Sequence, residues 1–135
     1  MEHRKLEETE FRFGEYGPGY MARGPRTDFG VVRLRPGDDA ENHYHAHIEE
    51  TFVGLEGEAT LWVDGRESYT VRPGELYRMD PGEQHYFVNE GDAVFRALFV
   101  KAPYNPKDGV KVPWTPGDPA PELAPAPQAP AGPAA

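Results

Sequence analysis

Three of the five histidines in this chain fall at alternate positions in the window NHYHAHIEETF, residues 42–52, and two adjacent glutamates follow them. These residues are His43, His45, His47, Glu49 and Glu50. Neutral imidazole binds Zn, Fe, Ni, Mn and Cu, and a carboxylate completes such a site and balances its charge. The window therefore predicts a metal site, with a pH-sensitive surface patch and an accident of composition as the alternatives.

The histidine spacing would place all three imidazoles on one face of a β-strand, because successive side chains on a strand alternate between faces. Two imidazoles two residues apart on a strand can chelate a single cation. Glu49 has the parity of the histidines, whereas Glu50 is excluded unless a turn over residues 46–49 breaks the strand and restarts the alternation. The window alone leaves the choice between the two glutamates open.

A wider pattern surrounds the window. Its anchors are Gly37, His43, His45, Glu50 and Gly57, with five, one, four and six residues between them. A second pattern, GELYRMDPGEQHYFVN, has its anchors at Gly74, Gly82, His85 and Asn89. These spacings resemble the two signature motifs of the cupin family over about residues 29–100. One departure is Asp80, which stands where the second cupin motif has proline, with Pro81 beside it.

The resemblance implies an all-β fold, a double-stranded β-helix or jelly-roll-like cupin barrel, with a metal ion in its mouth. Carried over by position, the ligands would be His43, His45, Glu50 and His85. Only Glu50 has six residues before Gly57, so the motif favours Glu50 over Glu49. The implied cofactor is one divalent transition metal, Fe, Mn, Ni or Zn, and the residues do not distinguish among these. Such a ligand set leaves one or two coordination positions open.

The resemblance further implies a metal-dependent enzyme of the dioxygenase, isomerase or lyase type, acting on a small polar organic molecule. The alternative is a non-catalytic module that binds or senses a small ligand. The nearest candidates for proton transfer are His47, Glu49 and Tyr77. The residues expected to contact substrate are Phe52, Gly54, Tyr77, Met79 and Phe87. Gly54 is expected either to leave room for substrate beside the metal or to mark a β-bulge.

These residues lie among short runs rich in Val, Tyr, Phe and Leu between residues 29 and 100. Turns such as RPGDD, DGRE and NEGD separate the runs from one another. About eight short strands at this spacing indicate a sandwich or small barrel. We expect a hairpin turn at Asp64-Gly65. The chain divides into an N-terminal arm with edge strands (1–28), a barrel with a flanking flap (29–114) and a disordered Pro/Ala-rich tail (115–135).

Three arginines, Arg33, Arg78 and Arg96, lie within apolar runs. A buried arginine would need a partner, and an anionic substrate is one candidate. A position on the solvent-facing side of the sheet is the alternative that we favour for each.

Composition limits the partners. The net charge is −9 and the pI is about 5.0, so phosphate backbones and anionic membranes are unfavourable partners. No apolar run is long enough to cross a bilayer. Without cysteine, histidine and carboxylate are the strong metal ligands that remain. We expect a cytoplasmic protein that binds a small molecule, and, by analogy with cupins, a homodimer.

Overall fold

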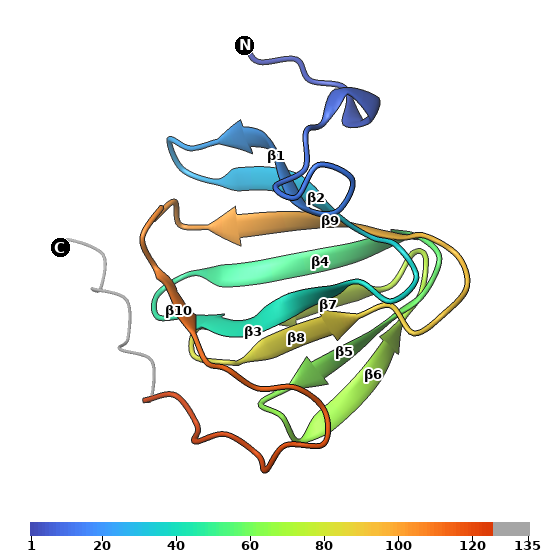
Figure 1. Cartoon of the computed structure of the whole chain (residues 1–135). Coiled ribbons are helices and arrows are strands. Elements are labelled where there is room, and N and C mark those ends of the chain that lie inside the picture. The colour runs from blue at the N-terminus through green and yellow to red at the C-terminus, as the bar shows by residue number, and fades with distance from the viewer. Residues whose placement is uncertain (126–135) are drawn as a thin grey trace, which may run out of the picture.

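The computed structural model describes residues 1–125, which form two five-stranded antiparallel sheets facing each other (Figure 1). The first sheet has the order β1-β2-β9-β4-β7 and the second β10-β3-β8-β5-β6. The strands of the first sheet are β1 (Gly17–Arg23), β2 (Asp28–Leu34), β9 (Phe95–Ala102), β4 (Glu49–Glu56) and β7 (Leu76–Met79). Those of the second are β10 (Gly109–Lys111), β3 (Asp39–His45), β8 (His85–Val88), β5 (Ala59–Val63) and β6 (Glu67–Val71). The all-β prediction is confirmed.

The alternation of side chains along the strands builds the core between the sheets. On β9, Phe95, Ala97 and Phe99 are buried while the residues between them are partly exposed. They pack with buried side chains from both sheets, among them Leu34, Phe52, Leu61, Val71 and Phe87. Phe52 lies 4.8 Å from Phe87 and 5.7 Å from His85 between ring centroids. The apolar core therefore borders the polar site directly.

Strand β3 ends at His45, and a bend follows before β4 begins at Glu49. The carboxylate of Asp108 holds this bend, because it accepts hydrogen bonds from the backbone N–H groups of His47 (2.7 Å) and Ile48 (2.8 Å). The alternation restarts after the bend, so Glu50 is buried. The prediction that His47 shares a face with the other two histidines is wrong, since its side chain is exposed.

Two anchors of the sequence motifs hold turns. Asn89 is fully buried, and its amide nitrogen donates to the carbonyls of Leu34 (2.9 Å) and Ala93 (2.8 Å). Gly37 has a φ of +88°, and its N–H donates to the carbonyl of Asn89 (2.8 Å). These bonds fix the approach of β2 to β3 and the end of β8.

The departure at Asp80 also has a structural role. Its backbone N–H donates to the Glu83 carboxylate at 2.7 Å. Proline has no backbone N–H and could not make this bond, so the aspartate at this position allows a hydrogen bond across the turn that precedes His85.

The first five residues of the chain are exposed, whereas the C-terminal part of the described chain packs on the second sheet. A short 3-10 helix, η1 (Leu6–Glu8), precedes β1, which pairs with β2 at the edge of the first sheet. On the second sheet, Trp114 is buried beside Trp62 and Tyr86. The hairpin at Asp64-Gly65 is confirmed, with both residues at positive φ, as a tight hairpin turn requires.

Part of the segment predicted to be a disordered tail runs beside the second sheet. The carbonyl of Glu122 accepts a hydrogen bond from Gln84 Nε2 (2.7 Å), and that of Pro121 accepts one from Arg66 (3.1 Å). Residues 126–135 lie outside the described residues, so the prediction for them stays a prediction. Within residues 1–125, no helix is long and apolar enough to cross a membrane.

Candidate metal centre and its pocket

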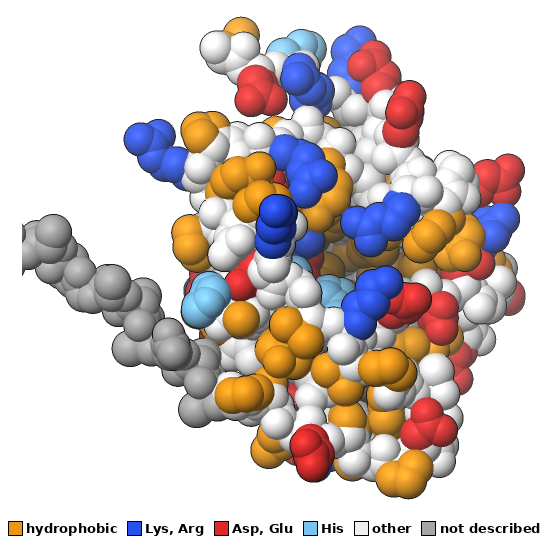
Figure 2. Space-filling view, turned by 60° about the vertical axis from the view of Figure 1, so that its left-hand side comes forward, with side chains coloured by type: hydrophobic (Ala, Val, Ile, Leu, Met, Phe, Trp, Pro, Cys, Tyr) orange, Lys and Arg blue, Asp and Glu red, His pale blue; other side chains and the backbone are white. Residues whose placement is uncertain are grey.

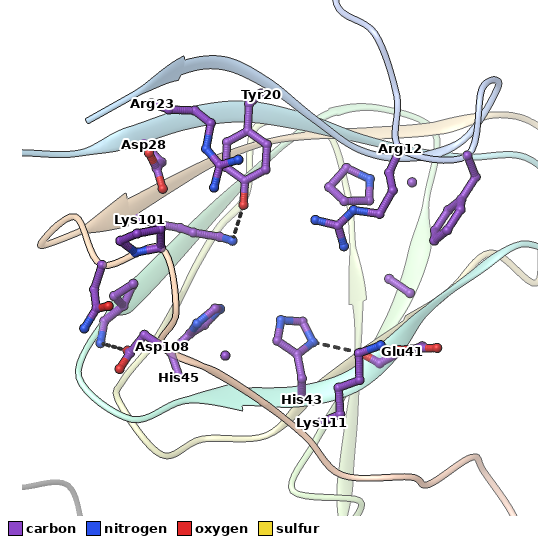
Figure 3. Close-up of a pocket in the computed structure, with 18 of the residues that line it drawn as sticks. Arg12, Tyr20, Arg23, Asp28, Glu41, His43, His45, Lys101, Asp108 and Lys111 are labelled. Atoms are coloured by element: carbon purple, nitrogen blue, oxygen red, sulfur yellow. Dashed lines mark hydrogen bonds and ion pairs between the residues drawn. The ribbon is translucent and has the colours of Figure 1, made fainter. Parts of the chain in front are cut away.

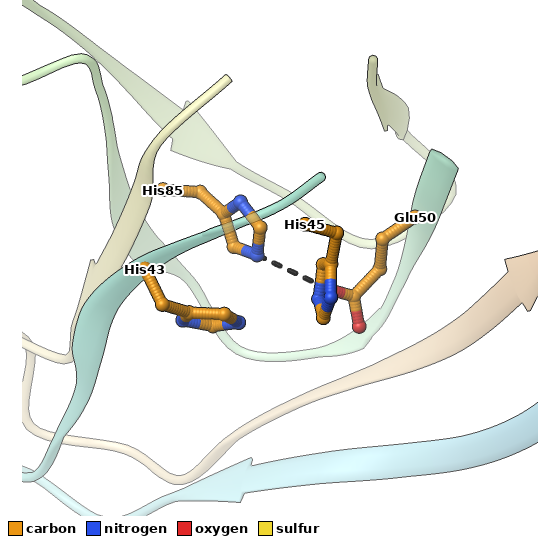
Figure 4. A group of neighbouring side chains, drawn as sticks. All are labelled: His43, His45, Glu50 and His85. Atoms are coloured by element: carbon orange, nitrogen blue, oxygen red, sulfur yellow. Dashed lines mark hydrogen bonds and ion pairs between the residues drawn. The ribbon is translucent and has the colours of Figure 1, made fainter. Parts of the chain in front are cut away.

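Four side chains, three from residues 43–50 and one from residue 85, come together between the two sheets (Figure 4). His43 and His45 lie on β3, His85 begins β8 opposite His43, and Glu50 lies on β4 in the other sheet. One ligand atom from each lies within 4.8 Å of all the others, and they could hold a metal ion. The pairing of β3 with β8 and the facing of the sheets assemble this group.

The separations of the ligand atoms suit a common cation. Glu50 Oε1 lies 3.1 Å from His45 Nε2 and 3.0 Å from His85 Nε2. Ligands bound at about 2.1 Å from a metal stand about 3.0–3.4 Å from one another in octahedral or tetrahedral arrangements. An imidazole nitrogen and a carboxylate oxygen at such distances repel unless a proton or a cation lies between them. One cation would satisfy the whole group at once.

Backbone carbonyls orient two of the rings. Nδ1 of His43 donates to the carbonyl of Glu41 (2.8 Å), and Nδ1 of His85 donates to that of Glu83 (3.2 Å). A proton on Nδ1 leaves the Nε2 lone pair free for a metal, which is the usual arrangement for ligating histidines. Nδ1 of His45 is buried with no hydrogen-bond partner among residues 1–125.

The charge states at neutral pH also suit metal binding. Burial, together with the neighbouring imidazole of His85, lowers the pKa of His43 to about 3. Burial by itself would raise the pKa of Glu50, but hydrogen bonds with His45 and His85 outweigh it and hold this pKa well below its usual range. Metal ligands must be neutral imidazoles and ionised carboxylates, and these are the states that the surroundings favour for His43 and Glu50.

A cavity of about 500 Å³ opens in front of His43 and His45 (Figure 3). The opposite wall comes from the N-terminal arm and β9, with Arg12, Tyr20, Arg23 and Lys101 facing the histidines. In the space-filling view, basic side chains gather around a hollow on this face (Figure 2). The arm is thus part of the wall of the pocket and does more than protect a sheet edge.

The residues expected to contact substrate do not line this cavity. Phe52, Met79 and Phe87 belong to the core. The hydroxyl of Tyr77 donates to the carbonyl of Thr70 at 3.3 Å. A Cβ at Gly54 would lie 2.1 Å from the carbonyl oxygen of Arg72, so the glycine permits a close approach of backbone and leaves no room for substrate. None of the five residues lines this cavity, and their contact with a substrate stays a prediction.

The candidates for proton transfer, His47, Glu49 and Tyr77, do not line the cavity either. The three arginines singled out in the sequence are also elsewhere. Arg33 donates to the carbonyl of Glu15, and Arg96 pairs with Glu56 at 2.6 Å. Arg78 is exposed on β7. The cations of the pocket come from other positions, which no spacing in the sequence marks.

Comparison with known proteins agrees with this architecture. The family described as "Cupin domain" matches residues 30–101, which is more than half of the chain. Over 58 residues the chain is 34% identical to L-ectoine synthase from Vibrio campbellii, a match covering 43% of this chain and 44% of that protein. Over 78 residues it is 32% identical to polyketide synthase CurC from Streptomyces cyaneus, covering 58% of this chain and 50% of that protein. The matches thus span half or less of each relative.

Among solved structures, a protein with a double-stranded β-helix domain from Klebsiella pneumoniae subsp. pneumoniae superimposes with a TM-score of 0.74. It is 21% identical, and the superposition covers 82% of this chain and 96% of that chain. The predicted double-stranded β-helix is confirmed by this likeness. With the family match over residues 30–101, the conclusion is that the chain belongs to the cupin family.

Proposed function

We propose that His43, His45, Glu50 and His85 bind one divalent transition metal ion, and that the protein is a metal-dependent enzyme acting on a small polar organic molecule. The observation that carries this proposal is the convergence of three imidazoles and one carboxylate beside a cavity of about 500 Å³. Fe, Mn, Ni and Zn all accept this donor set.

A bound divalent metal would supply Lewis-acid polarisation of a substrate oxygen or activation of dioxygen, if the metal is iron. The chain's own residues hold and surround the reacting molecule. The carbonyls of Glu41 and Glu83 fix the ring orientations of His43 and His85. Beside the centre, Phe52 and the core keep water from the inner side of the site. Glu50 and His45 are buried, so bulk water has little access to these two side chains.

The choice of an enzyme over a binding module rests on the relatives, since L-ectoine synthase is the name of an enzyme. The reaction type, whether dioxygenase, isomerase or lyase, is part of the proposal only as a class. Homodimer formation and a cytoplasmic location stay predictions. Size-exclusion chromatography with light scattering tests the first, and cell fractionation tests the second.

Metal content tests the site. Purified protein supplemented with Fe, Mn, Ni or Zn should retain one metal ion per chain after gel filtration, measured by elemental analysis. His45→Ala should abolish retention, because it removes a buried ligand beside Glu50. His47→Ala is the matched control from the same window, since its side chain is exposed and outside the group. A metal-free wild type, or a His45→Ala variant with full metal, would refute the site.

Enzymatic activity is a separate question from metal retention. The metal-loaded protein is incubated with candidate small acids and alcohols, and the mixture is analysed by mass spectrometry. Conversion supports the enzyme. Tight binding of a ligand that is recovered unchanged would favour the hypothesis of a binding module over that of an enzyme.

A further inference from the structure

Three cations face the candidate metal centre from the opposite wall of the pocket. Arg12 lies in the segment before β1, Arg23 ends β1, and Lys101 lies on β9 (Figure 3). The chain as a whole carries a net charge of −9. These three cations and Lys111 balance in number the four acidic side chains that line the cavity, Asp28, Asp39, Glu41 and Asp108, so the lining lacks the negative excess of the whole chain.

Lys101 is the innermost of these cations, with a side chain that is only 14% exposed. Its Nζ donates to the hydroxyl of Tyr20 at 2.8 Å and lies 3.9 Å from Glu50 Oε2. An ammonium group has three donors, so these two partners leave at least one for the pocket. The Tyr20 hydroxyl accepts from Lys101 and keeps its own proton for donation to a further acceptor.

The two arginines have no acidic partner of their own. Within residues 1–125, no carboxylate oxygen lies within 4.0 Å of either guanidinium group, and Arg23 instead stacks over the Tyr20 ring at 4.1 Å. Stacking of this kind holds the planar guanidinium in place and leaves its edges free for hydrogen bonds. Both groups are therefore available to a ligand in the cavity.

The acids of the same wall and floor, in contrast, all have partners within the protein. Asp28 accepts from the Gly24 N–H (3.0 Å), Asp39 from the Tyr86 hydroxyl (2.6 Å), Asp108 from the His47 N–H (2.7 Å), and Glu41 pairs with Lys111 (3.3 Å). The groups in the pocket that lack a partner are thus predominantly cationic. Such a lining complements an anion.

Metal binding would strengthen this preference. Glu50 is the one acid within 4.0 Å of Lys101 among the described residues, and on the proposed function it is a ligand whose charge the metal would compensate. The ammonium group would then lie in a largely buried position without a counter-charge, which is costly. An anionic group of a bound ligand would restore the balance.

We propose that the pocket binds a small organic anion carrying a carboxylate or phosphate group. That group lies against Arg12 and Arg23, with Lys101 and the Tyr20 hydroxyl between it and the metal centre. Guanidinium groups bind both kinds of anion through paired N–H donors. This assignment of substrate class rests on the proposed function in one respect, the orientation of the ligand. The other polar end of the ligand points toward His43 and His45.

Calorimetric titration of the zinc-loaded protein with three probes tests the assignment. Succinate carries carboxylates, glycerol 3-phosphate carries a phosphate, and succinamide is the neutral counterpart of succinate. At least one anion should bind at least about tenfold more tightly than succinamide, which is the factor that one charge-assisted hydrogen bond of about 1.4 kcal/mol gives. Tighter binding of succinate alone would assign a carboxylate group, and tighter binding of glycerol 3-phosphate alone would assign a phosphate group. Tighter binding of both would assign the anionic chemistry that they share. No preference over succinamide would overturn the proposal.

Variants locate the binding. Arg12→Gln and Arg23→Gln should each weaken anion binding about tenfold and leave any succinamide binding unchanged. Arg78→Gln is the matched control, because Arg78 is exposed on β7 and outside the cavity. Thermal denaturation of each variant verifies folding, and equal anion affinity in all three variants would overturn the proposal.

The metal content of the same samples separates this inference from the proposed function. Stoichiometric metal without arginine-dependent anion binding refutes the anion site alone. Arginine-dependent anion binding by a protein that never retains metal refutes the metal centre and leaves the anion site standing.

Discussion

Glu49 and Glu50 are adjacent and chemically identical, yet the fold places them in opposite environments. Glu50 is 4% exposed and lies within hydrogen-bonding distance of two imidazoles, whereas the side chain of Glu49 forms no hydrogen bond or ion pair within the described part of the chain. Neighbouring residues on a strand face opposite ways, so β4 can direct only one of the two carboxylates to the histidines.

This difference gives the first prediction. Glu50→Gln should lower zinc affinity at least about 100-fold, because even the loss of a partner outside the ligand shell costs about 10–100-fold. Glu49→Gln should change the zinc affinity by less than about twofold, since the Glu49 side chain is no ligand. A change of about twofold in affinity corresponds to a fraction of about 1 kcal/mol in binding free energy. Competition with a chromophoric chelator measures both. Equal affinities for the two variants would contradict the assignment.

The group of candidate ligands could be predicted because its spacing in the sequence resembles the two cupin motifs. His43, His45, Glu50 and His85 occupy the ligand positions of the two cupin motifs that the sequence resembles, and the fold brings their side chains together. The pocket residues Arg12, Tyr20 and Arg23 had no such signal. Their position depends on the pairing of β1 with β2 at a sheet edge, which an N-terminal segment rich in glycine and aromatic residues does not specify.

At the scale of single elements, Gly54 on β4 shows how the interpretation of a glycine depends on its neighbours. Its N–H donates to the carbonyl of Glu75 (2.9 Å), and its carbonyl accepts from the N–H of Gly74 (2.9 Å). The turn before β7 therefore packs directly on the β4 backbone. The sequence offered a cavity or a bulge, and the close contact with the backbone carbonyl of Arg72 excludes the cavity.

Gly54→Ala should consequently destabilise the protein by about 1–3 kcal/mol, the usual cost of forcing an extra methyl group into a packed site. The backbone carbonyl of Arg72, 2.1 Å from the added Cβ, cannot rotate away as a flexible side chain would. Urea unfolding followed by tryptophan fluorescence measures the change. Gly91→Ala is the control, because an added Cβ there would have only an ordinary contact, 3.4 Å from Asn89 Oδ1. Equal stability of the two variants would show that the turn adapts.

The turn between β2 and β3 gives a prediction that depends on pH. The side-chain hydrogen bond from Arg35 holds the pKa of Asp38 below its ordinary value of 3.8. The carboxylate therefore contributes stability that is fully present above that ordinary value and is lost as the pH falls through the lowered pKa of the folded state. Asp38→Asn should reduce stability at pH 6, and the difference from wild type should shrink toward pH 3.

Urea titrations at pH 6, 4.5 and 3 measure the free energy of unfolding of both proteins. Asp92→Asn supplies the comparison, because Asp92 is exposed and forms no hydrogen bond or ion pair within residues 1–125. A pH-independent gap between wild type and Asp38→Asn would rule out this contribution of Asp38.

Strand positions were predictable at this scale because glycine and proline turns delimit the apolar runs. The sequence predicted the bend at 46–48 only as the condition under which Glu50 could join the histidines. The bend depends on Asp108, about sixty residues further along the chain, whose carboxylate accepts hydrogen bonds from the N–H groups of His47 and Ile48. A contact over that sequence distance leaves no local pattern. The local sequence therefore does not specify the bend between β3 and β4, which the structure shows.

At the scale of the molecule, the candidate metal centre lies between the two sheets. His43, His45 and His85 belong to one sheet and Glu50 to the other. A cation held by all four would link the sheets in the folded state, whereas the unfolded chain keeps only His43 and His45 close together. Binding that favours the folded state stabilises it by mass action.

Zinc at 100 times its dissociation constant should therefore stabilise the wild type by about 2.7 kcal/mol. For a domain of this size, that corresponds to a rise in Tm of roughly 10 °C. His47→Ala should show the same rise and His45→Ala should not, because only His45 belongs to the group that joins the sheets. A chelator should return the wild type to its metal-free Tm, since the gain comes from binding alone. Differential scanning calorimetry measures the shift, and equal rises in both variants would mean that zinc binds the protein at a place other than between the sheets.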